Sequence, residues 1–464
     1  MATKLTATSS EPRTLATHPE LVSQKSFPFF RTVGESPKSP LERFLSLFAD
    51  VRAGEGIGVV LMTLNVFVLL GLYYLLKPAR EALVLTEGTA VEKAQAAAAQ
   101  ALLLVVVVPI FGWLASRVNR MRLIVITSLF FAGNLVIFAA LGQAGVREGV
   151  AFYVWLGIFN LFVVSQFWAF ANDFYTEGQG RRLFPMIGVG ASLGAWIGST
   201  SVPTLIERFA FTPYTLMLLG AVLLVASLGL TIAVNRQQHR HPDPQAASIA
   251  TAPLGREGGF SLILKDRYLL WIMALIILLN VVNTTGEFLL GSVIREASLA
   301  LEGDAARAAY IGSFYGSFFG WVNLTGFLLQ LFVASRVMRT AGVRGALFIL
   351  PVLALMNYSI IAVVPVLAVV RFGKILENGT DYSIQNTVRQ ALFLPTSREA
   401  KYKAKAAIDT FGTRVGDVAA AGVATAGTWA GMGLTGFAWL NVLFCFVWLA
   451  VAGQIAREHR RKTV

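Results

Sequence analysis

Long apolar stretches alternate with short polar segments along most of this chain. A helix needs about 20 mostly apolar residues to cross a bilayer. The stretches that meet this requirement predict twelve spans, near 57–78, 96–116, 122–142, 150–172, 183–206, 213–234, 268–293, 310–334, 345–363, 365–388, 405–428 and 434–456. The pattern therefore predicts an all-α integral membrane protein with twelve transmembrane helices.

Polar segments divide the predicted spans into two sets. Residues 1–56 form a polar tail that ends in a short amphipathic piece, and residues 457–464 form a second tail. Residues 235–266 are predicted to link a first six-helix half, 57–234, to a second, 267–456. Short echoes between the halves, such as "PAREA" with "VIREA" and "LASRVNRMR" with "VASRVMRTAGVR", indicate pseudo-symmetry. Two parallel halves of six helices are the plan of many secondary transporters. The stretch "GWLASRVNRMR" resembles the loop signature of the major facilitator superfamily.

Composition agrees with a membrane protein, because 14% of the 464 residues are charged against about 25% in soluble domains. The net charge of +13 is typical of nucleic-acid binders, but most of the 39 lysines and arginines fall in the tails and alternate loops. By the positive-inside rule both termini are cytoplasmic. We therefore expect a lipid bilayer and no nucleic acid as partner. The Ala/Val/Arg-rich usage and the lack of a targeting peptide favour a bacterial inner membrane.

Histidine and cysteine usage argues against an enzyme. The single cysteine, Cys445, lies in an apolar run, and the four histidines all lie in polar tails or loops. No nucleophile–base pair and no metal-ligand cluster is visible in the predicted spans. We expect neither catalysis, nor a metal, nor a cofactor.

Charged side chains interrupt the first and seventh spans. Tyr73, Lys77 and Arg80 follow one helix face, and Glu287 lies about 20 residues into the seventh apolar run. Charges at bilayer depth usually face a cavity or a partner. The alternatives are snorkelling of Lys77 and Arg80 at a span end, with Lys77 paired to Glu81, and a purely structural ion pair for Glu287.

The tenth and eleventh spans carry more charge. One face of the tenth holds Arg371, Lys374, Asn378, Asp381, Gln385 and Arg389. Its segment "ENGTDYS" is polar enough to predict local unwinding beside a wet pathway. In the eleventh span, Lys405 and Asp409 share a stripe, while Arg414 and Asp417 share its neighbour and could simply pair. Alternatively, Lys405 is only one of the positive charges that keep this helix end on the cytoplasmic side.

A modest surplus of basic side chains around a wet cleft favours an anionic substrate, because arginine and lysine bind phosphate and carboxylate. The predicted substrate-binding residues are Lys77, Arg80, Glu287, Lys374, Asp381, Arg389, Lys405, Asp409 and Arg414. Glycines at four-residue spacing, Gly190, Gly194 and Gly198, and again Gly412 and Gly416, predict close helix packing rather than a phosphate loop.

Four stretches resemble one known family. "LLKPAREALVLT", "FWAFAND", "EGQGRRLFPMIGVGAS" and "KAKAAIDTFGTRVGD" are similar to the ATP:ADP antiporters of the nucleotide transporter family, and to its bacterial branch in particular. The resemblance implies an alternating-access exchange of ATP against ADP, with phosphate as a possible further substrate. It places Arg80, Glu287 and Lys405 on functional positions of the family. In contrast to the family, residues 152–167 contain no acidic residue.

Two other functions stay open at this point. One is a facilitator-fold transporter of another organic anion, and the other is a non-transporting membrane sensor. The sequence leaves undecided the exact substrate and counter-substrate, the ion coupling, the direction of flux and the oligomeric state.

Overall fold

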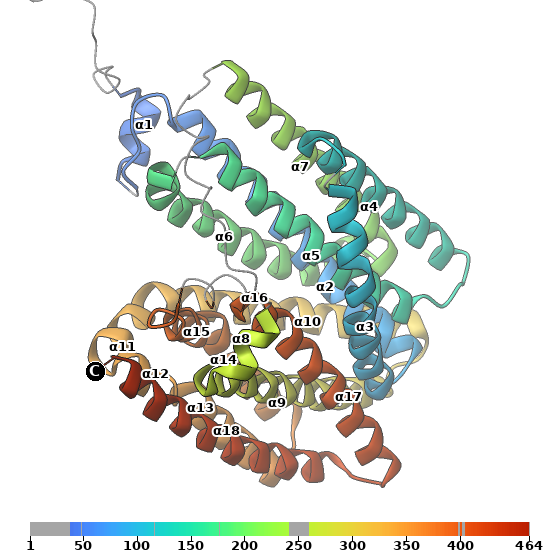
Figure 1. Cartoon of the computed structure of the whole chain (residues 1–464). Coiled ribbons are helices and arrows are strands. Elements are labelled where there is room, and N and C mark those ends of the chain that lie inside the picture. Colours follow the sequence, from blue (N-terminus) through green and yellow to red (C-terminus); the bar gives the residue numbers. More distant parts are fainter. Residues whose placement is uncertain are drawn as a thin grey trace, which may run out of the picture.

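In the computed structural model the chain is helical, and no strand occurs in the part that the structure describes (Figure 1). That part is residues 38–240 except 48, 116 and 176, and residues 259–463 except 398, 399 and 401–403. The first helices are α1 (Pro40–Leu45), α2 (Gly56–Glu87), α3 (Ala90–Ala115), α4 (Arg120–Gln143), α5 (Gly149–Phe174), α6 (Glu177–Phe209) and α7 (Pro213–Arg240). They are followed by α8 (Gly259–Lys265), α9 (Arg267–Ser298), α10 (Asp304–Leu328), η2 (Leu329–Ala334), α11 (Ser335–Thr340), α12 (Gly342–Ala346), α13 (Ile349–Val363), α14 (Leu367–Thr380), η3 (Asp381–Gln385), α15 (Asn386–Leu392), α16 (Lys405–Ala407), η5 (Ile408–Gly412), α17 (Thr413–Trp429) and α18 (Leu434–Thr463).

Ten of the described helices are long and apolar enough to cross a membrane. They correspond to the first nine predicted spans and to the twelfth, so the chain is a multi-pass, all-α membrane protein. The segments predicted as the tenth and eleventh spans are helical but broken, as α14–η3–α15 and α16–η5–α17. These two segments are too polar to count among the ten. Ten of the twelve predicted crossings are therefore confirmed as long, apolar helices.

Two hydrophobic clusters organise the bundle. One is built mainly from α2 and α4–α7, and the other from α9, α10, α13 and the helices that follow. Figure 1 shows these two sets of helices as two layers, with α1 and the C-terminus at the same end of the molecule. We call that end the terminal end and the opposite one the far end. Helix α3 also contributes alanines to the second cluster, so it packs across the boundary between the sets.

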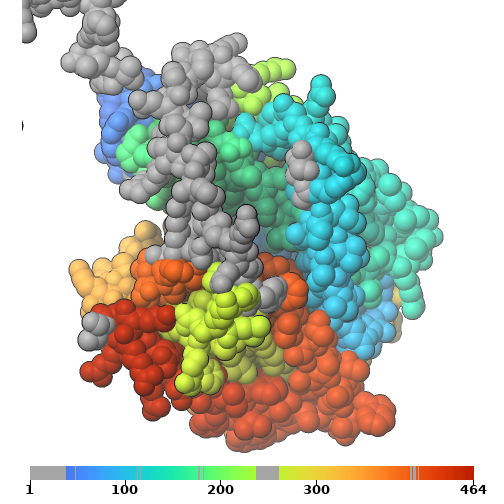
Figure 2. Space-filling view, viewed as in Figure 1, coloured from blue at the N-terminus to red at the C-terminus, as the bar shows by residue number. Residues whose placement is uncertain are grey.

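The two sets of helices touch from the middle of the bundle to the far end. The Asn323 side chain of α10 donates to the Ala195 carbonyl of α6 at 3.2 Å. Nearer the far end, the Arg295 guanidinium donates to the Gly88 carbonyl at 2.7 Å. In Figure 2 the coloured surfaces of the two sets meet at the far end and separate toward the terminal end.

Helix α6 packs against α2 along its glycines, as their spacing predicted. A Cβ atom on Gly194 or Gly198 would overlap the carbonyl of Phe67 or Gly71 on α2. In the second set of helices, a Cβ on Gly416 would lie 2.8 Å from the Ile277 carbonyl of α9. The glycines therefore allow the close backbone approach that small residues give membrane helices.

The predicted end of the first span is wrong. Helix α2 continues through Pro78 to Glu87, so Lys77 and Arg80 lie well inside it. A proline removes one backbone hydrogen bond but leaves the rest of the helix paired. The two cations thus lie inside the helix rather than at its end.

The predicted unwinding at "ENGTDYS" is also wrong. Residues 367–380 stay α-helical, and the irregularity is a π-helical segment, η3, that begins at Asp381. A π-helical turn keeps backbone groups hydrogen-bonded, which unwound chain at bilayer depth cannot do without other partners. A second such segment, η5, interrupts the eleventh predicted span at Ile408–Gly412.

Parts of three predictions lie outside the described residues. These are the N-terminal tail before residue 38, the linker between 241 and 258, and residue 464 of the C-terminal tail. The described end of the tail forms α1, whose start is closed by a reciprocal capping box between Ser39 and Glu42. The described ends of the predicted linker are helical, as the last turns of α7 and as α8.

Candidate functional site

A polar cavity of about 190 Å³ lies between the two sets of helices. Its walls come from α2, α3, α5, α9, α10, α17 and the α14–η3 segment. The polar residues that line it are Lys77, Arg80, Glu81, Lys93, Gln100, Tyr153, Asn283, Thr284, Glu287, Asn378, Tyr382 and Asp417. The site is therefore assembled from helices far apart in the sequence.

On the first wall, two cations enclose one carboxylate. The Lys93 ammonium lies 2.7 Å from the Glu81 carboxylate, and the Arg80 guanidinium donates to the same side chain, from its Nε at 3.1 Å. All three residues are at least nine-tenths buried. The face of the Arg80 guanidinium lies over the Tyr153 ring, 4.2 Å from its centroid. Glu81 thus pairs with Arg80 and Lys93, and not with Lys77 as the snorkelling alternative supposed.

Lys77 has a different environment. It makes no ion pair with a carboxylate among the described residues. Its ammonium instead lies 3.9 Å from the centroid of the Phe319 ring and 5.3 Å from that of Tyr74. A cation–π contact holds the ammonium weakly compared with a buried carboxylate. Lys77 is thus a cavity-lining cation whose charge is not neutralised by an adjacent carboxylate.

On the opposite wall, Glu287 faces two lysines, one from each set of helices. One of its carboxylate oxygens is 3.9 Å from the Lys93 ammonium, and the other is 3.9 Å from that of Lys374. The Asn378 amide donates to Glu287 at 3.0 Å. The Glu287 side chain is 22% exposed, whereas that of Lys374 is fully buried. Glu287 is therefore loosely held and open to the cavity.

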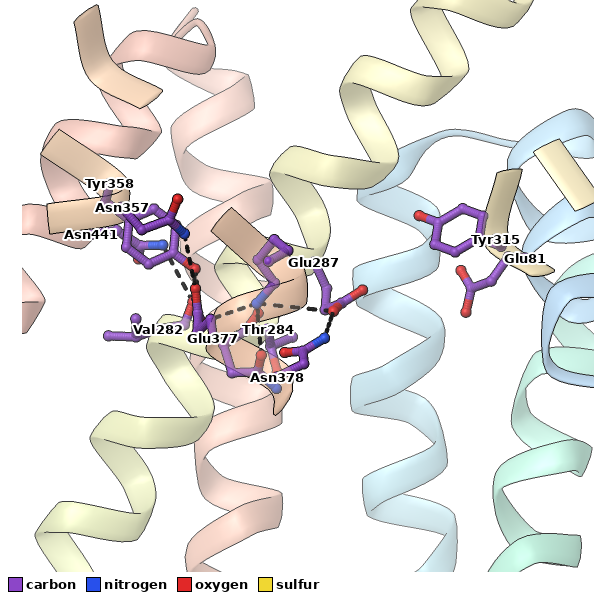
Figure 3. A network of polar contacts seen from close by, with 12 residues as sticks. Glu81, Val282, Thr284, Glu287, Tyr315, Asn357, Tyr358, Glu377, Asn378 and Asn441 are labelled. Atoms are coloured by element: carbon purple, nitrogen blue, oxygen red, sulfur yellow. Dashed lines mark hydrogen bonds and ion pairs between the residues drawn. The ribbon is translucent and has the colours of Figure 1, made fainter. Parts of the chain in front are cut away.

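A buried polar network lies behind Glu287, as Figure 3 shows. Lys374 donates to the Glu377 carboxylate at 3.0 Å and to the Asn283 side chain at 2.7 Å. Glu377 also accepts from the Tyr358 hydroxyl at 3.1 Å and from the Asn357 amide at 3.2 Å. Three helices, α9, α13 and α14, are tied together in this way. Because buried charges are stable only when they are paired and hydrogen-bonded, the network holds Lys374 in place beside Glu287.

The eleventh predicted span reaches the cavity through Asp417. The Arg414 guanidinium lies 3.2 Å from the Asp417 carboxylate, and the Thr284 hydroxyl donates to the same carboxylate at 3.2 Å. The predicted pairing of Arg414 with Asp417 is thus present. Asp417 lines the cavity, and Arg414 is placed behind it.

The other predicted site residues lie away from this cavity. Lys405 and Asp409 pair with each other at 3.0 Å, toward the terminal end. Arg389 of α15 donates to Asn386 at 3.3 Å, and Asp381 begins η3 without lining the cavity. Of the nine predicted residues, three line the cavity, namely Lys77, Arg80 and Glu287. Lys374 and Arg414 each contact a lining residue.

The sequence reasoning missed Lys93 and overlooked the central role of Glu81. Lys93 stands three residues before the second apolar run, so it was assigned to a loop. In the structure α3 begins at Ala90, and its first turn packs against α9 and brings Lys93 into the cavity. A signal was available in the sequence, because "AVEKAQAAAAQ" is a strong helix former that extends the span toward its N-terminus.

The structure reduces the predicted basic surplus. Three cations and three carboxylates line the cavity, counted over the described residues. Most of these charges neutralise each other in contacts already described. The positive potential is therefore concentrated at Lys77 and at the outer edges of Arg80 and Lys93, rather than spread over the whole cleft.

Comparison with solved structures identifies the fold. The chain superposes on the nucleoside transporter NupG with a TM-score of 0.61 and 13% identity, covering 86% of this chain and 98% of that one. It is similar to a bacterial homologue of the iron transporter ferroportin in an inward-facing state, with a TM-score of 0.62, 11% identity, and 86% and 98% coverage. At these identities the likeness shows the fold alone, which the chain shares with these transporters. The chain belongs to the TLC ATP/ADP transporter family, whose model matches residues 150–459.

Curated relatives agree with that membership. The chain is 23% identical over 306 residues to ADP,ATP carrier protein 1 of Chlamydia muridarum, which is 57% of this chain and 56% of the relative. It is 23% identical over 300 residues to ADP,ATP carrier protein 1 of Rickettsia bellii, with 57% and 58% coverage. The aligned part thus spans a little more than half the length of these relatives.

Proposed function

We propose that this protein exchanges ATP against ADP across a membrane by alternating access, with phosphate as a further substrate. The observation that carries the proposal is Lys77, a cavity cation with no carboxylate partner among the described residues, one helical turn from Arg80. Membership of the ATP/ADP transporter family and the names of the relatives support nucleotides as the anions. We propose transport rather than catalysis.

The substrate phosphates bind at Lys77 and at the exposed edge of Arg80, because both cations face the cavity. Two aromatic side chains that line the cavity, Phe319 and Tyr382, offer surfaces for a planar base. The cavity of about 190 Å³ is smaller than the 300–1,000 Å³ typical of sites that enclose a whole ligand. A whole nucleotide therefore enters only when the two sets of helices separate on one side.

Lys93 couples substrate binding to the conformational change. Its ammonium attracts Glu81 of the first set of helices at 2.7 Å and Glu287 of the second at 3.9 Å. A bound phosphate competes for this ammonium and weakens its attraction for Glu287. Occupancy of the site thereby changes the energy that holds the two sets together, which is the requirement for coupled exchange.

We further propose a bacterial inner membrane, with both termini on the cytoplasmic side, and rigid movement of residues 57–234 against 267–456. The structure then represents a form that is closed at the far, external end. ATP carries one more negative charge than ADP, so the exchange is balanced by phosphate, a proton or the membrane potential.

The test is counter-exchange in proteoliposomes. Vesicles preloaded with ADP take up labelled ATP, and Lys77→Gln lowers that rate by at least about tenfold, the effect of losing roughly 1.4 kcal/mol of anion binding. Glu287→Gln keeps an acceptor for Asn378 but loses the charge that faces Lys93, so net exchange falls while the protein still binds ATP. The matched control is Arg339→Gln, which removes an exposed positive charge from α11.

The proposal is overturned if the unaltered protein takes up no nucleotide in a way that depends on a counter-substrate inside the vesicles. A second candidate, transport of another organic anion, is favoured by the lack of an acidic residue between 152 and 167. Competition of ATP uptake by sugar phosphates and dicarboxylates separates the two, because the true substrate competes best. If no solute is moved and the Lys77 variant changes only the binding of a partner protein, the chain is a sensor.

A further inference from the structure

A groove of about 810 Å³ lies on the outside of the bundle, away from the central cavity. It is formed by α6, α10 and α14, and thus at a junction of the two sets of helices. Its lining residues are Ile206, Glu207, Ala309, Tyr310, Ser313, Phe314, Ser317, Leu367, Ala368 and Arg371. Most of these side chains are apolar, but a carboxylate and a guanidinium are present among them.

Arg371 points to this groove and not to the transport pathway that its position on the α14 stripe predicted. It is absent from the lining of the central cavity. Its guanidinium donates to the Ser317 hydroxyl at 2.7 Å and lies 5.3 Å from the centroid of the Phe314 ring. No carboxylate pairs with it in the part of the chain that the structure describes. Charges in membrane helices are usually paired or hydrogen-bonded, and the Arg371 guanidinium has donors left for an anion beyond its bond to Ser317.

Glu207 lies in the same groove and is likewise without a cationic partner among the described residues. It is exposed, and its carboxylate accepts a hydrogen bond from the Ser313 hydroxyl. Ser313 and Ser317 are four residues apart on α10, so they lie one above the other on one face, about 6 Å apart. These two serines hold the opposite charges of Glu207 and Arg371 about one helical turn from each other.

The depth of the two charges matches that of lipid headgroups. Glu207 is two residues from the end of α6, and Arg371 is four residues from the start of α14. Four residues of helix rise by about 6 Å. Both groups therefore lie near the far-end surface of the membrane, and the apolar walls of the groove continue from there toward its interior. Tyr310, 38% exposed, lies beside them as an aromatic residue of the interface.

We propose that this groove binds a phospholipid with a phosphoethanolamine headgroup. The phosphate accepts hydrogen bonds from the Arg371 guanidinium, the ammonium donates to the Glu207 carboxylate, and the acyl chains follow the apolar walls. An anionic headgroup without an amine leaves Glu207 unpaired beside a negative charge. A choline headgroup has no N–H to donate.

The site is distinct from the nucleotide cavity, and its test does not depend on transport. Native mass spectrometry of the full chain in detergent, titrated with phosphatidylethanolamine, phosphatidylcholine or phosphatidylglycerol, measures retention of each lipid. We expect phosphatidylethanolamine to bind at least about tenfold more tightly than the other two, since only its headgroup makes charged hydrogen bonds to both Arg371 and Glu207.

Two variants separate the roles of the charges. Arg371→Gln loses the bound phospholipid, whereas Glu207→Gln still binds phospholipid but no longer prefers ethanolamine over choline. Matched controls are Arg339→Gln and Glu302→Gln, which remove exposed charges outside the groove. Thermal unfolding checks that each variant is folded, and the exposed Glu207 variant keeps the test valid if Arg371→Gln does not fold.

Several outcomes overturn the proposal. They are equal binding of the three lipids, an unchanged ethanolamine preference in Glu207→Gln, and retention of the lipid by folded Arg371→Gln. Displacement of the lipid by soluble phosphoethanolamine or inorganic phosphate at equal concentration also contradicts it, because the apolar walls then contribute nothing.

Discussion

At the scale of single residues, two lysines of the membrane helices have opposite electrostatic surroundings. Lys374 is fully buried and paired with Glu377, whereas Lys77 faces a cavity and aromatic rings. A buried ion pair adds little net stability, but removing one partner leaves an uncompensated charge. The two lysines therefore serve different purposes: Lys374 holds structure, and Lys77 is available to a ligand.

The pair predicts a specific stability pattern. Lys374→Met leaves the Glu377 carboxylate buried without its cation, and we expect the free energy of unfolding to fall by about 3–5 kcal/mol. Adding Glu377→Gln removes the unpaired charge and keeps one oxygen that can accept from the Tyr358 hydroxyl, so part of the loss returns. Thermal unfolding of both variants in detergent measures this. A double variant as unstable as the single one, or less stable, contradicts the prediction.

Glu148, at the start of α5 and outside the predicted span, gives a prediction about pH. Burial and the neighbouring Glu87 carboxylate raise the pKa of Glu148 to about 7 from its ordinary 4.5. Between these values the folded protein holds a proton that the unfolded chain has released. The contribution of Glu148 to stability therefore falls as the pH rises from about 4.5 to about 7.

The variant Glu148→Gln isolates this effect. We expect it to unfold at a higher temperature than the unaltered protein at pH 8, with a smaller difference at pH 4.5. Melting curves at both pH values, with Glu302→Gln as the exposed control, measure the difference. Identical pH dependence with and without the Glu148 carboxyl group would refute the assignment.

At the scale of elements, the course of α2 and α6 decides where the charges lie. Helix α2 continues past Pro78 to Glu87, which places Arg80 and Glu81 inside the bundle. Helix α6 approaches α2 so closely that its glycines face backbone carbonyls of α2. The position of the basic wall of the cavity thus depends on the packing of these two helices.

Two glycines of α6 test this packing on one helix. A methyl group on Gly194 would overlap the Phe67 backbone, whereas Gly188 has nothing within 4 Å of an added Cβ. Gly194→Ala should cost about 1–3 kcal/mol by overpacking. Gly188→Ala should leave stability unchanged or raise it by up to about 1 kcal/mol, since alanine favours the helix. The melting temperatures of the two variants in detergent test this prediction. Equal melting temperatures for Gly194→Ala and Gly188→Ala contradict close packing at Gly194.

At the scale of the whole molecule, the two sets of helices are joined toward the far end. The Gln95 amide of α3 donates to the Thr425 hydroxyl of α17 at 3.2 Å across that junction. Alternating access requires contacts of this kind to break during each cycle. For the proposed exchange, the far end is therefore the place where a covalent bond between the halves should stop transport.

A cysteine pair tests this movement. Gln95→Cys combined with Thr425→Cys, joined by a short thiol-reactive cross-linker, should abolish exchange in proteoliposomes. Cleavage of the linker should restore it. Each single-cysteine variant, treated in the same way, is the control, and the native Cys445 is buried. Exchange at an unchanged rate after complete cross-linking would show that this junction does not open.

Several features of the site followed from local sequence. Lys77, Arg80 and Glu287 are charged residues within apolar runs, and desolvation makes such residues exceptional enough to recognise without a structure. The glycine spacing predicted the packing of α6 for the same local reason. Lys93 was missed because it precedes its apolar run. Arg371 was predicted to face the pathway because it shares a helix face with Lys374 and Asn378. The sequence does not show which neighbouring helices that face contacts.

The sequence by itself thus determined the class of this protein, since the lengths of the apolar runs and the cost of charge in lipid depend on chain order alone. The tertiary structure decided which charges meet. Arg80 and Lys93 share the Glu81 carboxylate, Lys374 pairs with Glu377 on its own helix, and Lys77 has no carboxylate partner among the described residues. Glu287 of α9 lies 3.9 Å from Lys93 of α3 and from Lys374 of α14, so these contacts join helices that are far apart along the chain. They depend on how α3, α9 and α14 pack, and the periodicity of a single helix carries no information about that packing.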